Sequence, residues 1–355
     1  MRVPDRRHDA VVGALLSAVA EELQVDAGRQ ETLQRNLRRA ESLLVAAADQ
    51  VVAVDQDALR AVENPSLLVY HRRMLLCVDL DGVVYRGSEP VPGVGAVLAA
   101  RHRAGDTVFY VTNNSFLRRS EYRARVESCG APFAEERILT AAGAVAARFA
   151  AEGRRRILVY GAEGLADEMR AAGIEARRTA AFADAAALAD WAPDGVTVGL
   201  DRAGTWRDLA LATHAVRAGA ALLVPNRDAT YPDADGLVPG TGAAVAALEA
   251  ASGARATVVG KPAPDLLIAA AAADGSDVTA AVMIGDSTET DIAAANAAGC
   301  RSILLLTGVT DSAPVDLSTP NAAALEYLPV AKRPTRVARD AAALASILEE
   351  WSPSS

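Results

Sequence analysis

The sequence predicts an α/β protein with a doubly wound parallel-sheet core, a smaller α/β unit inserted into that core, and a helical N-terminal extension. Short apolar runs alternate with helical patterns after residue 70, as parallel sheets require. Several of these runs end directly in small polar or acidic residues, and the first 70 residues show helical periodicity alone. The expected boundaries are 1–70 for the extension, 71–154 and 241–355 for the core, and 155–240 for the inserted unit.

Length and composition agree with this organisation. A chain of 355 residues exceeds the usual size of one domain. Hydrophobic residues make up 51% of the chain and aromatic residues only 4%, which favours helices packed on a sheet over an all-β design. The net charge is -9 without a basic block, so we expect no nucleic acid partner, because phosphate-backbone binding needs a clustered cationic face.

Cysteine usage and hydropathy indicate a cytoplasmic protein. Cys77, Cys129 and Cys300 lie far apart without CxxC spacing, so we expect reduced, buried thiols that do not bind metal. No apolar run is long enough to cross a bilayer, and acidic residues interrupt the apolar patch near the N-terminus, where no cleavage site follows. We therefore expect no membrane partner.

The extension has apolar stripes that must be buried against another surface. Leucines and valines recur at spacings of three and four, and Asn64-Pro65 closes the region. We expect a helical hairpin on the main domain or on a second subunit; a homo-oligomer through these helices or through the inserted unit stays open. Arg35, Arg38 and Arg39 form a short basic face, for which a solvated surface is favoured over a ligand contact.

The first core strand ends in two carboxylates. Leu75 to Val78 form a buried apolar run, and Asp79 and Asp81 follow with Gly82 allowing a sharp turn. Residues two apart on an extended chain lie on the same side, so the two charges repel unless a cation or a shared proton intervenes. This segment alone fits equally well a metal-assisted nucleophile with a neighbouring acid/base and an ordinary Asp-Gly turn.

The second core strand also ends in polar groups. A helix is expected from Val94 to Arg103, followed by a strand from Thr107 to Val111 and the tip Thr112-Asn113-Asn114-Ser115. Ligands bind at the carboxyl edge of parallel sheets, and a hydroxyl beside backbone N–H groups suits a phosphoryl oxygen. A helix N-cap with a turn explains the same residues.

The inserted unit alternates strands and helices between about Arg154 and Gly240. Its strands are expected at 157–160, 196–200 and 222–225, and its helices at 164–172 and 206–217. The polar loop 226–233 either faces substrate or is a plain connector. A helix from Ala243 to Ala251 is expected to return the chain to the core.

Two further strand tips carry charged groups. Lys261 follows a strand beginning at Thr257, and Asp286 follows the strand beginning at Val282, with Asp291 close behind. Each residue alone has an ordinary explanation, a surface lysine or an N-cap. Four strand tips that all carry groups suited to phosphate and a divalent cation indicate one shared site.

The sequences DLDGVVYRG, VTNNS, VGKPAPDLL and MIGDSTETDIAAANAAG resemble, in order and spacing, the four motifs of the haloacid dehalogenase-like (HAD) superfamily. The segments GLDRAGTW and PNRDATYPDADGLVPGTGAAVAAL are similar to the type C2 (IIA) cap of its NagD-like, p-nitrophenylphosphatase branch, which includes phosphoglycolate and glycerol-phosphate phosphatases. The resemblance covers Leu75 to Leu348 and implies a Rossmann-like core with an α/β cap.

The resemblance implies a role for each matched residue. Asp79 is the expected nucleophile, and Asp81 the acid that protonates the leaving oxygen and then activates water. Thr112 and the Asn113 backbone hold the phosphoryl group, and Lys261 balances its charge. Asp79, the Asp81 carbonyl and Asp286 bind Mg²⁺, with Asp291 as a supporting carboxylate. The candidate substrate contacts are Gly82, Asn113, Asn114, Asn226, Arg227, Asp228 and Tyr231.

The expected function is therefore a Mg²⁺-dependent phosphatase that hydrolyses a small phosphorylated metabolite through an aspartyl-phosphate. Asp81 favours a phosphatase or mutase, because the superfamily's dehalogenases lack an acid at this position. A phosphotransferase or mutase, or a catalytically silent binding protein, is the alternative. Aromatics are few in the cap, with Trp206 and Tyr231 the main candidates, which favours a polyol or sugar phosphate. Arg227 is either a contact for an anionic substrate tail or, as we favour, an ordinary surface arginine.

Overall fold

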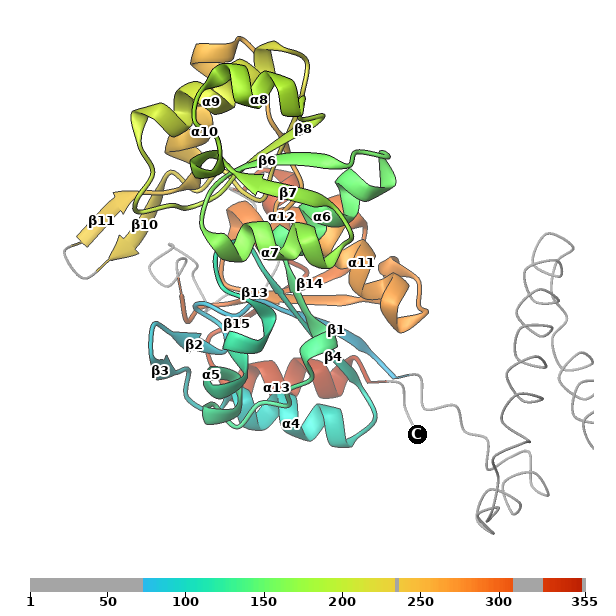
Figure 1. Cartoon of the computed structure of the whole chain (residues 1–355). Coiled ribbons are helices and arrows are strands. Elements are labelled where there is room, and N and C mark those ends of the chain that lie inside the picture. Colours follow the sequence, from blue (N-terminus) through green and yellow to red (C-terminus); the bar gives the residue numbers. More distant parts are fainter. Residues whose placement is uncertain (1–72, 234–235, 309–327, 353–355) are drawn as a thin grey trace, which may run out of the picture. The chain divides into compact units, whose positions relative to one another are not determined.

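The computed structural model describes residues 73–233, 236–308 and 328–352 (Figure 1). The chain divides into two compact units, Met1–Val69 and Tyr70–Ser355. The helices and the Arg35–Arg39 basic face that the sequence predicts for the extension lie outside the described residues.

A six-stranded parallel sheet forms the part of the second unit that we call the core. Its strand order is β15-β14-β13-β1-β4-β5, and all neighbouring pairs are parallel. The strands are β1 (Leu75–Val78), β4 (Thr107–Thr112), β5 (Ile138–Thr140), β13 (Val282–Gly285), β14 (Arg301–Leu305) and β15 (Arg336–Ala338).

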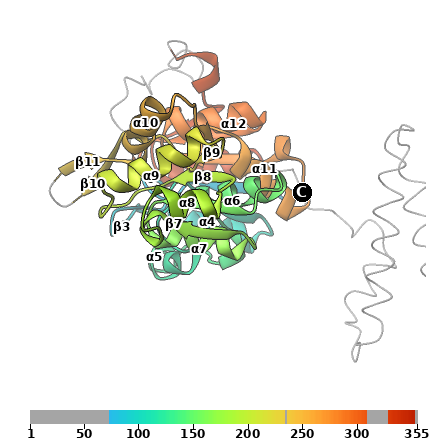
Figure 2. The ribbon, with the colours of Figure 1, turned by 45° about the horizontal axis from the view of Figure 1, so that its top comes forward.

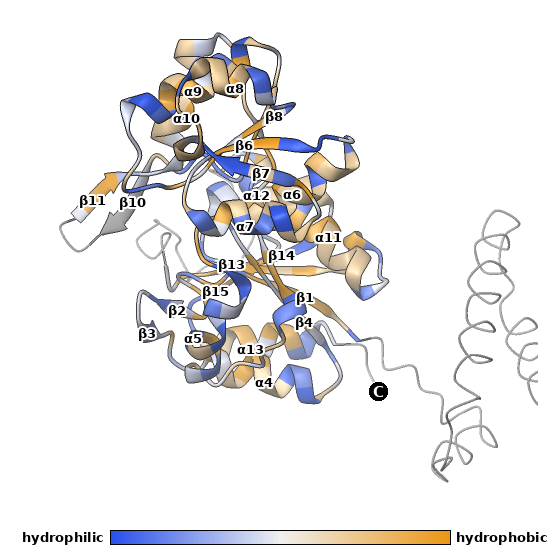
Figure 3. Ribbon diagram, in the orientation of Figure 1, coloured by the Kyte–Doolittle hydropathy of each residue, from blue (hydrophilic) through white to orange (hydrophobic). Residues whose placement is uncertain are grey.

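Both faces of the core sheet are covered by helices. Leu76 and Val78 of β1 pack on one face, and Leu75 and Cys77 on the other. The first face carries α4 (Val94–Arg103), α5 (Arg123–Ser128) and α13 (Ala341–Glu350), and the second carries α11 (Asp265–Asp274) and α12 (Ala293–Ala298). The core strands are therefore apolar on both sides, and most of their residues carry the hydrophobic colour in Figure 3. The predicted doubly wound sheet is confirmed.

A five-stranded parallel sheet forms the part that we call the cap. Its strand order is β12-β9-β8-β6-β7. The strands are β6 (Arg156–Tyr160), β7 (Glu175–Arg178), β8 (Gly195–Val198), β9 (Ala221–Val224) and β12 (Thr257–Val258). One face packs against α8 (Ala185–Trp191), α9 (Trp206–Arg217) and α10 (Thr241–Ser252), and the other against α6 (Ala141–Ala151) and α7 (Glu163–Ala171) (Figures 1 and 2).

The strand at Thr257 belongs to a different sheet from the one expected. The sequence predicts it in the core sheet, but Thr257 and Val258 pair with Leu223 and Val224 of β9 in the cap. The preceding helix α10 also packs in the cap cluster. A two-residue strand has too few side chains to specify its neighbour, so the local pattern cannot distinguish the two sheets. The predicted domain limits themselves stay predictions.

Two short hairpins complete the strands. β2 (Tyr85–Arg86) pairs with β3 (Glu89–Pro90) just after Asp81. β10 (Thr230–Asp233) pairs with β11 (Gly236–Pro239), so the polar loop after β9 leads into a hairpin of the cap. Within the described ranges, no helix has both the length and the apolar character needed to span a membrane.

Candidate active site

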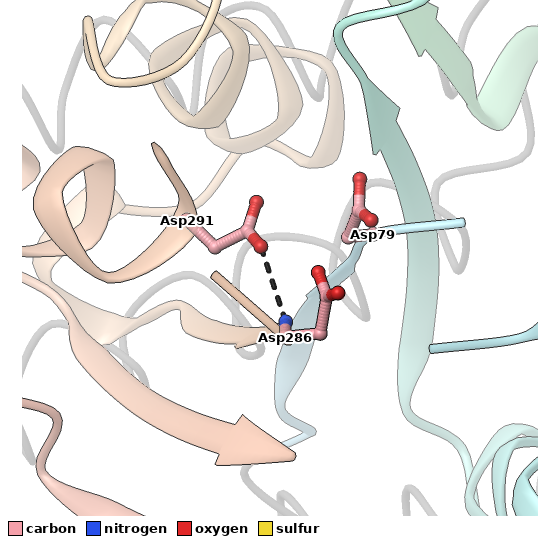
Figure 4. Close-up of side chains that lie close together, drawn as sticks. All are labelled: Asp79, Asp286 and Asp291. Carbon is pink, nitrogen blue, oxygen red and sulfur yellow. Dashed lines mark hydrogen bonds between the residues drawn. The ribbon is translucent and has the colours of Figure 1, made fainter. Parts of the chain in front are cut away.

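Three buried carboxylates meet at the carboxyl edge of the core sheet (Figure 4). Asp79 directly follows β1, Asp286 directly follows β13, and Asp291 lies in η6 (Thr288–Ile292), a π-helical turn. One oxygen of each carboxylate lies within 4.8 Å of the others. The structure thus brings together the residues expected at these two strand tips.

Asp291 organises the loop that carries Asp286. Its Oδ2 accepts hydrogen bonds from the backbone N–H groups of Asp286 and Ser287, both at 3.1 Å; the first is drawn in Figure 4. The Asp291 side chain is only 1% exposed, so these bonds are shielded from water. This arrangement suits the supporting role expected of Asp291.

Lys261 reaches the same site from the loop after β12. Its Nζ lies 2.5 Å from Asp79 Oδ1 and 2.7 Å from Asp291 Oδ1, and donates to the Val111 carbonyl at 3.0 Å. Burial lowers the pKa of Lys261, but the charges of Asp291 and Asp79 outweigh this and raise it above the ordinary value. Lys261 is therefore a permanent cation between two of the carboxylates.

The carboxylate cluster fits a divalent cation. Burial raises the pKa of Asp79, as do the nearby charges of Asp291 and Asp286, while Lys261 lowers it. With all groups ionised, three carboxylates and one ammonium carry a formal charge of -2 in a buried space. A dication would neutralise that charge, and carboxylate oxygens are the ligands that Mg²⁺ prefers.

Asp81 stands beside this cluster in a different environment. Its side chain is exposed at the surface, yet partial desolvation by the surrounding protein raises its pKa. The charges of Arg125 and Lys261 and the Gly87 N–H lower the pKa by less. A raised pKa suits a group that must first donate a proton. Its carboxylate is outside the three-carboxylate cluster, in keeping with an expected metal contact through the carbonyl.

Gly82 is required by the geometry of the turn. Its φ of +84° lies in the left-handed region, and a Cβ would stand 2.3 Å from Asp286 Oδ2. Any side chain here would displace Asp286. Gly82 therefore lets the turn approach the cluster, whereas its expected substrate contact stays a prediction.

The polar tip after β4 is held at the same edge. Thr112 is buried, and its Oγ1 accepts from the Asn114 N–H at 3.1 Å. Asn113 Nδ2 donates to the Lys261 carbonyl at 2.8 Å. Asn114 Oδ1 accepts from the N–H groups of Phe116 and Leu117, so this oxygen shapes the loop.

The cap loop after β9 contacts this tip. Asn226 is buried; its Nδ2 donates to the Asn113 carbonyl at 2.8 Å, and its Oδ1 accepts from the Asp228 N–H. Burial raises the pKa of Asp228, the positive charge of Lys261 lowers it, and the negative charge of Asp291 raises it. The Asp228 carboxylate therefore interacts electrostatically with the charged groups of the core site. Tyr231 lies on β10, opposite Val238.

Arg227 is engaged by the protein itself. Its Nη1 and Nη2 donate to the two carboxylate oxygens of Glu249 on α10, at 3.0 and 2.5 Å. Glu249 is 6% exposed and also accepts from Arg255 and the Ala256 N–H. This fork fixes the loop that carries Asn226 and Asp228. Nothing in the sequence signals a pair separated by 22 residues.

Two further residues near Asp81 escaped the sequence interpretation. The Arg125 guanidinium lies over the Tyr85 ring, 4.9 Å from its centroid, and its charge lowers the pKa of Asp81. Tyr85 is in the first motif and Arg125 is on the helix after the second, so proximity to two motifs was the available signal. Their side chains border the expected acid/base.

Family models and relatives match the chain over these same residues. A haloacid dehalogenase-like hydrolase model matches residues 76–175, and a HAD-hydrolase-like model matches residues 258–344. An acid sugar phosphatase from Staphylococcus saprophyticus is 30% identical over 192 residues, which cover 54% of this chain and 70% of that protein. The chain belongs to the haloacid dehalogenase-like hydrolase family. The phosphatase relatives confirm the predicted NagD-like, subclass IIA branch.

Further similarities within the HAD family are to glycerol phosphate phosphatases. The D-glycerol 3-phosphate phosphatase of Mycobacterium tuberculosis is 37% identical over 195 residues. That match spans 54% of this chain and about half, 52%, of the relative. A crystal structure of glycerol phosphate phosphatase from the same organism, in complex with magnesium, has a TM-score of 0.65 at 34% identity and covers 77% of each chain.

Proposed function

We propose that this HAD-family chain is a Mg²⁺-dependent phosphatase that hydrolyses a small phosphorylated metabolite through an aspartyl-phosphate intermediate. The observation that carries the proposal is the pairing of Asp79 with Lys261 inside a cluster of buried carboxylates. A carboxylate can attack a phosphoryl group only where positive charge offsets the repulsion between the two anions. The cluster supplies one fixed cation and the ligands for a second.

The proposed reaction has two displacements. An Asp79 carboxylate oxygen attacks phosphorus, and the bond from phosphorus to the leaving oxygen breaks as Asp81 donates a proton to that oxygen. Asp81, now a carboxylate, takes a proton from water, which attacks the aspartyl-phosphate and releases inorganic phosphate. The raised pKa of Asp81 supports the first of these tasks.

The remaining core residues hold the reacting groups. Magnesium would be held by Asp79, Asp286 and the Asp81 carbonyl, with Asp291 fixing the Asp286 loop. When bound, the ion supplies charge neutralisation for the phosphoryl oxygens. Thr112 Oγ1 and the Asn113 N–H are the proposed phosphoryl contacts, and Lys261 balances the charge of the phosphoryl group.

We propose a polyol or sugar phosphate as the substrate. The mycobacterial relative is a D-glycerol 3-phosphate phosphatase, and the staphylococcal one is an acid sugar phosphatase. Trp206, one of the two aromatic candidates in the cap, is 83% exposed, so it offers no enclosed ring contact. Asp228, whose pKa is shifted by the charges of Lys261 and Asp291, is the favoured cap contact, and Tyr231 follows it three residues later. A cytoplasmic location and a homo-oligomer stay predictions.

A metabolite panel tests this proposal. Phosphate release is measured with Mg²⁺ on glycerol phosphates, sugar phosphates and nucleoside monophosphates, with and without a chelator. We expect Mg²⁺-dependent release that is fastest on a polyol or sugar phosphate. Absence of release from every phosphomonoester, by folded protein that binds Mg²⁺, would contradict phosphatase activity. Transfer of phosphate to an added alcohol instead of water would favour the phosphotransferase alternative.

A further inference from the structure

A short core segment after β4 makes contacts with the cap. We call residues 113–119 the junction segment. Its first residue, Asn113, accepts the hydrogen bond from Asn226 of the cap loop. Further along, a Cβ on Gly164 would lie 2.2 Å from the Phe116 carbonyl oxygen, so the start of α7 lies directly against the segment's backbone. The segment is continuous with Thr112, the proposed phosphoryl contact.

The last two residues of the junction segment, Arg118 and Arg119, form ion pairs with acidic residues of helix α7. Arg118 Nη2 lies 2.6 Å from Asp167 Oδ2, and Arg119 Nη2 lies 3.0 Å from Glu168 Oε2. Both arginines follow the second core motif, whereas both acids lie on a cap helix. These pairs therefore join the phosphate-binding side of the core to the cap.

The two pairs differ in burial. Arg118 and Asp167 are 55% and 33% exposed, so solvent screens their attraction. Glu168 is only 9% exposed, and its partner Arg119 is 37% exposed. A cleft of about 500 Å³ borders both pairs. The Arg119–Glu168 pair is thus the stronger constraint, since removing Arg119 leaves a nearly buried carboxylate without its cation.

We infer that Arg119, paired with Glu168, is a positioning residue that sets the placement of the cap relative to the phosphoryl-binding tip. The inference rests on the proposed phosphatase function. Thr112 and Arg119 lie on one continuous core segment, whereas Glu168 lies on α7 of the cap. A shift of α7 relative to this segment therefore changes the distance between cap residues such as Asp228 and the proposed nucleophile Asp79. A metabolite that touches the cap depends on that spacing, whereas a small generic ester depends on the core alone.

Kinetics on paired substrates test this inference. Arg119→Met and Glu168→Gln are each expected to lower kcat/KM for the preferred metabolite by about fivefold or more. Turnover of p-nitrophenyl phosphate should stay within about twofold of the unmodified protein. The double variant should be no worse than either single variant, because they remove the same interaction. Arg119→Lys, which keeps the charge, should recover most of the activity.

The pair Arg178–Asp201 provides the matched control. It is similar in length and burial, at 2.7 Å with exposures of 30% and 14%, but lies wholly within the cap. Arg178→Met should lower the melting temperature about as much as Arg119→Met does. It should leave unchanged the ratio of the kcat/KM values for the preferred metabolite and p-nitrophenyl phosphate. Equal losses on both substrates in Arg119→Met, or the same change of ratio in Arg178→Met, would overturn the positioning role.

A structural readout separates this inference from the proposed function. Spin labels are placed at Ala100 on α4 and Arg217 on α9, both exposed, with Cys129 changed to serine. We expect the core–cap distance distribution to broaden or shift in Arg119→Met and to be unchanged in Arg178→Met. If the unmodified protein releases no phosphate, the proposed function fails while this measurement still decides the placement role. Identical distributions in all three proteins would refute it.

Discussion

Lys261 connects the proposed nucleophile Asp79 to the loop that carries the proposed metal ligand Asp286, because its ammonium pairs with both Asp79 and Asp291. Its removal would leave two buried carboxylates without a common cation, which is costly in a low-dielectric site. Burial already raises the pKa of Asp79, and loss of Lys261 would raise it further. A protonated Asp79 cannot attack phosphorus.

We therefore expect Lys261→Met to reduce phosphate release by at least roughly a hundredfold. The matched control is Lys332→Met, which breaks a peripheral pair with the 67% exposed Glu289. Steady-state kinetics with saturating Mg²⁺ measure both variants. Activity of Lys261→Met close to that of Lys332→Met would show that the buried cation is dispensable.

Glu249 gives a pH-dependent contribution to stability. Hydrogen bonds from Arg227 and from the Ala256 N–H lower the pKa of Glu249 to about 2 in the folded protein. A lowered folded pKa gives stability that is present above the unfolded value, near 4.3, and is lost as the pH falls towards 2. Glu249→Gln should lower the free energy of unfolding by roughly 1.5–3 kcal/mol at pH 7.

The difference between Glu249→Gln and the unmodified protein should narrow as the pH falls below about 4. Urea denaturation at several pH values measures it, down to the lowest pH at which both proteins fold. A difference in the free energy of unfolding that stays constant on acidification would mean that these hydrogen bonds do not lower the pKa of Glu249.

For single residues, the sequence predicted which polar side chains lie at the ends of strands better than it predicted which residues they bind. Asp79 and Asp286 directly follow buried strands and Thr112 is the last residue of one, and parallel topology brings such ends to one edge. Arg227 could not be assigned in the same way, because its partner Glu249 lies in another element and no local pattern encodes that choice.

Among the elements, the π-helical turn η6 has a specific task. It places Asp291 so that Oδ2 accepts from the backbone N–H groups of Asp286 and Ser287. Groups that orient a ligand typically change metal affinity by about 10–100-fold when removed. Asp291→Ala should lower the affinity for Mg²⁺ by that factor, so that phosphate release requires a correspondingly higher Mg²⁺ concentration.

Glu289→Gln is the matched control for this turn, because Glu289 lies in η6 but is exposed and pairs with Lys332. Titration of activity against Mg²⁺ compares the two variants. An unchanged Mg²⁺ requirement in Asp291→Ala would mean that the turn does not support the metal site.

Element assignment from sequence succeeded where periodicity was long and failed where it was short. The helices at 94–103 and 206–217 are observed at their expected bounds. The second buries an apolar stripe of Leu211, Ala212, Ala215 and Val216, whereas glycine-containing turns delimit the first. β12 has two residues, and its place in the cap sheet depends on α10 and β9. Its misassignment did not affect Lys261, because the loop after β12 still leads to the core edge.

Across the whole molecule, the alternation of strands and helices was sufficient to predict a doubly wound core sheet with a smaller α/β unit inserted into it. Strands buried on both faces read as continuous apolar runs, which a one-sided sheet does not produce. Alternation does not reveal how core and cap meet. The junction segment and the α7 ion pairs depend on contacts between residues about 50 positions apart, which no local pattern signals.

The unit Tyr70–Ser355 contains all the proposed catalytic residues. A chain beginning at Tyr70 should therefore keep Mg²⁺-dependent turnover, whereas loss of the predicted apolar stripes of residues 1–69 should change the oligomeric state or cause aggregation. Light scattering after gel filtration, together with kinetics, tests this expectation. Complete loss of turnover in a folded, soluble truncated chain would contradict it.

The most direct test of the proposed aspartyl-phosphate mechanism is the substitution Asp79→Asn, which keeps the shape of the side chain and removes the proposed nucleophilic carboxylate. Asp106→Asn is the control, because Asp106 is equally buried in the core but pairs with Arg101 away from the site. Release of phosphate from p-nitrophenyl phosphate with Mg²⁺ should fall at least about a thousandfold in Asp79→Asn and remain largely intact in Asp106→Asn. Undiminished release by Asp79→Asn would contradict an aspartyl-phosphate mechanism.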